Sequence, residues 1–154
     1  MSLKFLTILL LLTPKILMAN STPPAGCFPL PISGDNFNIK AKKSTLILIN
    51  NQSANNLWLT HPVNDPSASA GWTTQLDKGR WSALVTDKDF VIGCIEFKPG
   101  HEQQIPCEEV ITGCVLKKVS FPEDSKGGYW AVENSKKKEL IAKLNARGIE
   151  KRYK

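Results

Sequence analysis

Two histidines, His61 and His101, are the residues of this chain best suited to general acid–base chemistry near neutral pH. Hydrolysis would require one of them beside a nucleophilic serine and an orienting partner, and the two lie in separate segments that we expect to be loops. The chain contains no G-x-S-x-G, H-E-x-x-H or P-loop pattern. We therefore expect no catalytic residues and no enzymatic activity, and we rank a small secreted hydrolase third among the possible functions.

A copper site of the cupredoxin type is the metal site that the spacing of Cys94 and His101 suggests. Such sites usually add an axial methionine, and the chain has none after Met18, which falls in the expected leader. An oxidised Cys94 could not serve as a thiolate ligand. The spacing of Cys107 and Cys114 also differs from the C-x-x-C motif of zinc and redox sites. We expect neither a metal nor a cofactor.

Aromatic residues near turns are the strongest candidates for binding. Trp72 follows a loop of small residues, and Trp81 stands next to Arg80 after a tight turn. Such side chains could stack on a sugar or anchor a protein partner, although the core of a β-sandwich is the favoured location for Trp58 and Trp81. The candidate binding residues are Trp72, Arg80, Trp81 and His61.

The first 19 residues have the pattern of a secretory signal peptide. Lys4 precedes an apolar segment that starts at Phe5, and Ala19 is a suitable cleavage position. No segment downstream is apolar for the roughly 20 residues that a transmembrane helix requires. We expect an exported protein, periplasmic or secreted, with no membrane span after cleavage. Lipidation of Cys27, which follows Ala-Gly as in bacterial lipoproteins, is the alternative.

Export places the four cysteines in an oxidising compartment, so we expect two disulfides rather than a lipidated Cys27 with one stranded thiol. Four cysteines allow three pairings. Our prediction is Cys94–Cys114 with Cys27–Cys107, which would tie the N-terminal arm to the core. A Cys94–Cys107 bridge stays possible, because a turn at Pro99-Gly100 that pairs Lys98 with His101 places the two cysteines diagonally on one face of a hairpin.

Short strand-like segments separated by turn residues predict an antiparallel β-sandwich in residues 45–134, preceded by a proline-rich extended arm in residues 20–44. The segment Phe90–Phe97 is apolar on both faces, so we expect it to be buried on both. Asp77-Lys78-Gly79 suits a hairpin loop. The predicted strands are Thr45–Asn50, Leu57–Thr60, Thr73–Leu76, Trp81–Thr86, Phe90–Phe97, Gln103–Cys107, Cys114–Phe121 and Gly128–Val132.

The positive charge is concentrated at the C-terminal end. Residues 135–154 contain eight Lys and Arg against two Glu, whereas residues 20–134 contain ten basic and twelve acidic residues. A helix capped by Asn134 or Ser135 and running to about Arg147, with Gly148 as its stop, is predicted to cover one face of the Phe90–Phe97 strand. This basic helix could contact an anionic surface, while nucleic acid is not expected because the basic run lacks interleaved aromatic residues.

The strings LWLTHPV at Leu57–Val63, PSASAGW at Pro66–Trp72 and WSAL at Trp81–Leu84 resemble exported "enhanced entry" proteins of the EnhB type from intracellular bacteria. The resemblance continues with Cys94 and with PGHEQ and PC at Pro99–Gln103 and Pro106–Cys107. It implies an envelope or secreted β-rich protein associated with host-cell entry and virulence, with no catalytic residues to transfer. We expect a non-enzymatic protein that binds another protein or a cell surface, with a carbohydrate-binding module as the alternative.

Overall fold

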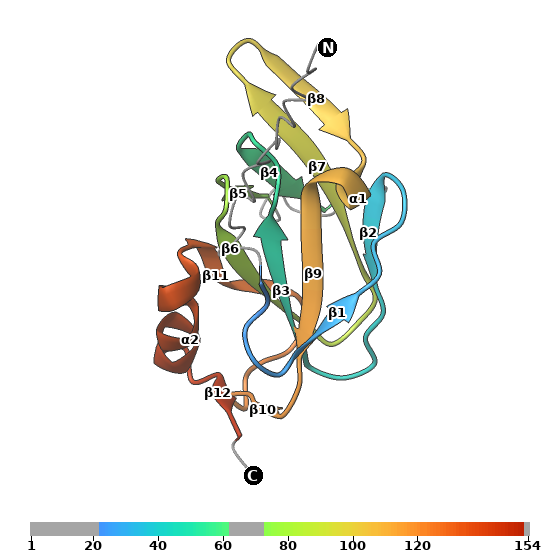
Figure 1. Ribbon diagram of the computed structural model, residues 1–154. Helices are drawn as coiled ribbons and strands as arrows, with labels where there is room; N and C mark the ends of the chain where they lie inside the picture. The colour runs from blue at the N-terminus through green and yellow to red at the C-terminus, as the bar shows by residue number, and fades with distance from the viewer. Residues whose placement is uncertain (1–21, 62–72, 153–154) are drawn as a thin grey trace, which may run out of the picture.

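The computed structural model describes residues 22–61 and 73–152 (Figure 1). Twelve strands and two helices follow one another in this part of the chain. Their bounds are β1 (Cys27–Leu30), β2 (Asn36–Ile39), β3 (Thr45–Asn51), β4 (Leu57–Thr60), β5 (Thr74–Leu76), β6 (Trp81–Thr86), β7 (Phe90–Lys98), β8 (His101–Ile105), α1 (Cys107–Val110), β9 (Ile111–Leu116), β10 (Val119–Ser120), β11 (Tyr129–Ser135), α2 (Lys137–Ala146) and β12 (Glu150–Lys151).

Two antiparallel sheets form the sandwich that the sequence predicts. The first sheet has the order β1-β9-β3-β6-β11, and the second has the order β2-β7-β4-β5, with β8 also paired to β7. Strands β10 and β12 form a separate two-stranded sheet. The predicted strands at Leu57–Thr60 and Trp81–Thr86 have the expected bounds. The predicted strand Gln103–Cys107 is wrong at its end, because Cys107 begins α1.

The N-terminal arm supplies one strand to each sheet instead of lying outside the sandwich. Strand β1 pairs with β9 in the first sheet, and β2 pairs with β7 in the second. Strand β1 carries Pro29 and lies at the edge of its sheet, which is where a residue without a backbone N–H is tolerated.

The inner apolar cluster fills the space between the two sheets. It includes Phe37 from β2, Ile47 from β3 and Ile92 from β7. The layers approach closely at Gly113 on β9, where an added Cβ would lie 2.6 Å from Cζ of Phe37. A side chain at position 113 would therefore displace the Phe37 ring from the core.

Helix α2 packs on the outer face of the first sheet and not on β7, so the predicted location of the helix is wrong. Leu140 and Leu144 share an outer apolar cluster with Trp81, Leu48 and other residues of the first sheet. Strand β11, the last strand of that sheet, is joined to α2 by Lys136 alone, and this short connection keeps the helix beside β11 and β6 (Figure 1). The predicted stop is confirmed, since Gly148 has a positive φ of 72°.

Strands β3 and β6 are the strands buried on both faces, because their outward side chains lie in the outer cluster to which α2 contributes Leu140 and Leu144. Strand β7 is buried on one face only, with Phe90 and Ile92 inside and Phe97 44% exposed, which corrects the expectation that it is buried on both. The predicted hairpin at Asp77-Lys78-Gly79 is also corrected. Gly79 does have a positive φ of 70°, but the turn connects β5 of the second sheet to β6 of the first.

The disulfides are Cys27–Cys114 and Cys94–Cys107, so the predicted pairing is wrong. Cys114 belongs to the outer cluster and Cys94 to the inner one, so the first sheet separates them. Cys27 and Cys114 lie on adjacent strands with Cα atoms 5.5 Å apart. The predicted β7–β8 register, with Lys98 opposite His101, is confirmed, and the chain beyond β8 brings Cys107 to a Cα distance of 5.3 Å from Cys94.

Candidate anion-binding cleft

The two histidines lie in different environments and do not form a common site. His61 follows β4, where its Nδ1 lies 2.7 Å from the carbonyl oxygen of Val91 and its ring stacks on Phe90 at a centroid distance of 4.2 Å. His101 is exposed at the start of β8 and pairs with Lys98. Thr60, the neighbour of His61, pairs with Gly93, whereas His101 pairs with Lys98 at the end of β7. The two histidines therefore lie at different positions along β7. His61 therefore holds the end of β4 in place.

Trp81 is not a surface residue, which corrects its assignment as a binding residue. Its side chain is only 1% exposed and belongs to the outer cluster beneath α2. A buried indole cannot stack on an external sugar or enter a partner. Trp72 lies outside the described residues. Trp58 is half-buried on β4, opposite Gln75 and Ile95.

Arg80 lies in a cleft of about 680 Å³ where the β5–β6 turn meets the start of α2. We call this site the basic cleft. Five of its eight lining residues are cations, and none of the eight is acidic. The lining residues are Pro24, Lys78, Gly79, Arg80, Lys136, Lys137, Lys138 and Ile141. The basic cleft thus unites Arg80 and the basic helix, which the sequence presents as two unrelated features.

A pair of side chains holds the β5–β6 turn against the end of β11. The backbone N–H of Asp77 donates to Oδ1 of Asn134 at 2.9 Å, and Nδ2 of Asn134 donates to Oδ2 of Asp77 at 2.9 Å. Asn134 has a positive φ of 43°, a conformation that asparagine tolerates better than most residues. Its own N–H donates to Oγ of Ser82 on β6 at 3.1 Å. This two-way contact fixes the turn relative to the segment that enters α2.

The backbone of the turn is tied to β3 as well. The carbonyl oxygen of Arg80 accepts hydrogen bonds from Nδ2 of Asn50 at 2.9 Å and from the N–H of Asn51 at 3.1 Å. The N–H of Gly79 donates to the carbonyl oxygen of Asn51 at 3.0 Å. Asn50 and Asn51 are both buried, so these bonds are shielded from water. Lys78 and Arg80 therefore project from a rigid turn.

The start of α2 adds its own positive potential to the cleft. The N-cap residue, Lys136, makes no side-chain capping hydrogen bond, and Lys136, Lys137 and Lys138 surround the positive end of the helix dipole. Lysines at this position destabilise a helix by some tenths of a kcal/mol each. An anion bound in the cleft would reverse that effect, because it would be attracted to the lysines and to the helix end together.

The cleft cations are not neutralised by the salt bridges found in the described part of the chain. Those salt bridges join Lys40 to Asp89, Lys98 to Glu96 and Lys143 to Glu139. The chemistry of the cleft is consequently that of a receptor for carboxylate, phosphate or sulfate groups, with an arginine for bidentate contacts and several lysines as point charges.

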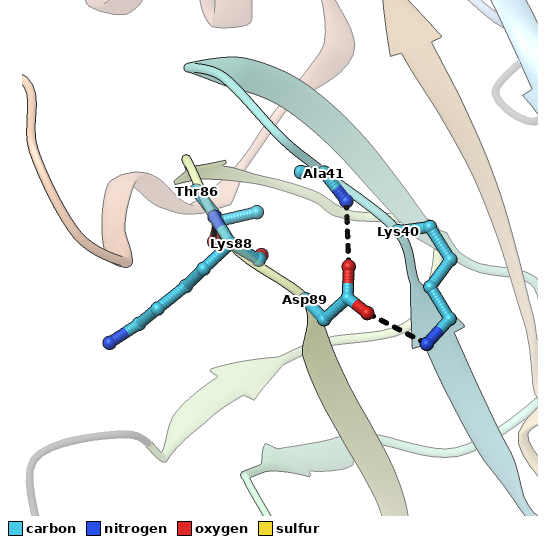
Figure 2. A network of polar contacts seen from close by, with 5 residues as sticks. All are labelled: Lys40, Ala41, Thr86, Lys88 and Asp89. Atoms are coloured by element: carbon cyan, nitrogen blue, oxygen red, sulfur yellow. Dashed lines mark hydrogen bonds and ion pairs between the residues drawn. The ribbon is translucent and has the colours of Figure 1, made fainter.

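Asp89 forms the clearest polar network outside the cleft, in the turn between β6 and β7 (Figure 2). Its carboxylate accepts hydrogen bonds from Nζ of Lys40 at 2.8 Å and from the N–H of Ala41 at 3.2 Å. In the same turn, Oγ1 of Thr86 donates to the carbonyl oxygen of Lys88 at 2.8 Å. The bond from Lys40 and then the bond from Ala41 lower the pKa of Asp89 below its usual value. The network joins the β2–β3 connection to the β6–β7 turn and contains no nucleophile paired with a base.

Glu96 is held in a similar way on β7. Its carboxylate contacts Lys98 and the side-chain amide of Asn55, and these two hydrogen bonds, with that of Lys98 the larger influence, lower its pKa. Residues 22–61 and 73–152 contain no group of three or more His, Cys, Asp or Glu side chains that could hold a metal ion.

Lys78 and the Asp77–Asn134 pair are the parts of the site that the sequence analysis missed. The three consecutive lysines at a helix start were a usable signal, because they oppose the helix dipole and imply a compensating partner. The contact between Asp77 and Asn134 has no such signal, since 57 residues separate the two.

In comparisons with known proteins, no family model, curated protein or solved structure matches this chain.

Proposed function

We propose that the protein is an exported, non-enzymatic binding protein that docks through the basic cleft onto an acidic face of another protein. The observation that carries the proposal is the union of five cations from two distant segments around one cleft with no acidic lining residue. Complementary charge speeds association and selects partners more than it adds raw affinity. An acidic protein surface is the matching partner.

Export is supported by the leader pattern at residues 1–19 and by the two disulfides, because small disulfide-bonded domains are typical of oxidising compartments. None of the helices in the described ranges is both long and apolar enough to cross a membrane. The partner under this proposal is an envelope or host-surface protein. A role in host-cell entry and virulence is what the resemblance to the EnhB-type proteins adds to the proposal.

The test is binding of a poly-glutamate peptide to the purified protein at two salt concentrations. We expect wild-type binding that weakens as salt rises, because the contacting charges are exposed to screening. In the double variant Arg80→Gln/Lys137→Gln, affinity should fall about twofold to thirtyfold, given about 0.2–1 kcal/mol for each of two exposed ion pairs. Neither side chain takes part in the hydrogen bonds that hold the β5–β6 turn.

The matched control is Lys88→Gln/Lys126→Gln, which removes the same charge from exposed positions away from the cleft. Equal weakening in the control would reject the cleft and leave a general effect of net charge. The partner would then be identified by cross-linking and co-purification from envelope and medium fractions. It should be recovered with the wild type and with the control variant but not with the cleft variant.

A further inference from the structure

A second cavity lies at the other end of the first sheet and has a different character. It occupies about 870 Å³ where β3 begins, β9 ends and β10 leads away. We call it the rim groove. It is lined by Lys43, Ser44, Thr45, Leu46, Val115, Leu116, Lys117, Lys118, Val119, Phe121 and Arg152. Its volume lies within the range of about 300–1,000 Å³ that is typical of small-molecule sites.

The floor of the rim groove is apolar because α2 covers only part of the outer face. Helix α2 packs mainly on β11 and β6 (Figure 1). The groove is lined instead by the start of β3 and the end of β9. Val119 and Phe121 are half-buried and supply the accessible apolar surface of the groove, above the buried Leu46 and Leu116 of the same outer cluster. This floor would favour a hydrocarbon chain over water.

The margin of the rim groove is cationic. Lys43, Lys117, Lys118 and Arg152 are all exposed, and none of the eleven lining residues is acidic. These cations come from three separate segments of the chain, so their convergence does not follow from a local run of lysines. Lys117 is also held in place, with its Nζ 4.2 Å from the centroid of the Phe28 ring.

The turn that carries Lys118 is fixed in an unusual conformation. Lys118 has a positive φ of 56°, which is uncommon for a residue with a long side chain. The N–H of Arg152 donates to the carbonyl oxygen of Lys118 at 2.7 Å, and the pairing of Val119 with Lys151 continues this contact. Lys118 and Arg152 are thereby fixed next to each other at one margin of the groove.

We propose that the rim groove binds a single-chain amphiphile with an anionic headgroup, such as an alkyl phosphate or a fatty acid. The hydrocarbon chain lies against Val119 and Phe121, above Leu46 and Leu116, and the headgroup contacts the cations at the margin. The basic cleft, whose lining is mostly cationic, offers no comparable apolar floor. This inference is independent of the proposed function, because the two sites share no lining residue.

The test is a titration of the ¹⁵N-labelled protein with decyl phosphate below its critical micelle concentration, followed by NMR. We expect shifts in the amide signals of Ser44–Leu46 and Val115–Val119 and not in those of Lys136–Lys138. Octyl and hexyl phosphate should bind progressively more weakly, by about fourfold for each methylene that the groove no longer buries. Decyl maltoside carries the same hydrocarbon chain with an uncharged headgroup, so it tests the contribution of the anionic headgroup. Inorganic phosphate is an anion without a chain, so it tests the contribution of the chain.

The variant Lys118→Asn/Arg152→Gln should weaken decyl phosphate binding by about twofold to thirtyfold, because two exposed cations are removed. Asparagine tolerates the positive φ at position 118, so the fold should be retained, and Arg152→Gln alone serves if the double variant unfolds. The matched control Lys137→Gln/Lys138→Gln removes the same charge from the basic cleft and should leave decyl phosphate binding unchanged.

Three results would overturn the proposal. Equal binding of decyl maltoside would show a site that ignores charge, and equal binding of inorganic phosphate would show an anion site that ignores the chain. An absence of shifts in the groove residues below the critical micelle concentration would show no site for the monomeric amphiphile. None of these results affects the poly-glutamate test, so failure of one proposal is distinguishable from failure of the other.

Discussion

Asp89 shows how single side chains hold this fold together at its surface. The residue is exposed, yet it accepts hydrogen bonds from Lys40 and from the backbone of Ala41 (Figure 2). These bonds favour the ionised carboxylate, so the pKa of Asp89 is lower in the folded protein than in the unfolded chain. Ionised Asp89 therefore fastens the connection after β2, part of the N-terminal arm, to the turn that begins β7.

The stability of the protein should consequently depend on pH through Asp89. Because the folded pKa is depressed, the contribution is complete above the unfolded value of about 3.9 and is lost as pH falls through the folded pKa. Urea unfolding at about pH 6 and about pH 3 should show a loss of stability in the wild type that is smaller in Asp89→Asn. Glu123→Gln, at an exposed carboxylate in the connection from β10 to β11, is the control and should keep the wild-type pH dependence. Identical profiles for Asp89→Asn and the wild type would contradict this role.

Helix α2 covers the part of the outer face of the first sheet that is formed by β6 and β11. It supplies Leu140 and Leu144 to the cluster that includes Trp81. The helix has a narrow apolar stripe and three lysines at its start, so its isolated stability would be low. Packing against β6 and β11 therefore maintains the helix, and the helix in turn keeps Lys136–Lys138 beside the β5–β6 turn.

Replacing Leu140 by alanine should weaken this docking. The side chain is fully buried, so we expect a loss of about 2–5 kcal/mol in the free energy of unfolding, measured by urea denaturation. Lys143→Ala, which removes the exposed i,i+4 pair with Glu139, should cost only about 0.3–0.5 kcal/mol. Comparable costs for the two variants would mean that α2 is not packed on the sheet as described.

At the scale of the whole molecule, the two disulfides fasten different parts of the chain to the sandwich. Cys27–Cys114 spans 87 residues and fastens the N-terminal arm to β9. Cys94–Cys107 spans 13 residues and fastens α1 to β7. The longer span restricts the unfolded chain more strongly in the chain-entropy model. The N-terminal arm is thus an integral part of the fold.

Mass spectrometry of the unreduced protein should confirm this pairing. Trypsin leaves the Lys98–Pro99 bond intact, so a second cleavage after glutamate is needed to separate Cys94, Cys107 and Cys114. We expect the peptide Asp89–Glu96 to be linked to Gln103–Glu108, and Val110–Lys117 to be linked to the peptide that contains Cys27. A link between Asp89–Glu96 and Val110–Lys117 would contradict the structure.

Local chemistry was sufficient to predict much of the sandwich. The Pro99-Gly100 turn specified the β7–β8 register, since proline and glycine suit its two central positions, and Gly148 marked the end of α2. Alternating apolar residues and turn signals located β4 and β6. Arg80 and the lysines of the basic helix were also evident as charged residues. Each of these features depends on neighbours within a few positions of the chain.

The disulfide pairing, the location of α2 and the assembly of both cavities depended instead on which strands lie side by side. Cys94 and Cys114 are 20 positions apart in sequence and still lie on opposite sides of a sheet, because side chains alternate between its two faces. The burial of Trp81 depends in part on α2, which supplies Leu140 and Leu144 to the same cluster. The sequence by itself determined the class of fold and its supply of cations. The tertiary structure alone decided that those cations converge, because convergence requires contacts such as Asp77 with Asn134 that no local pattern encodes.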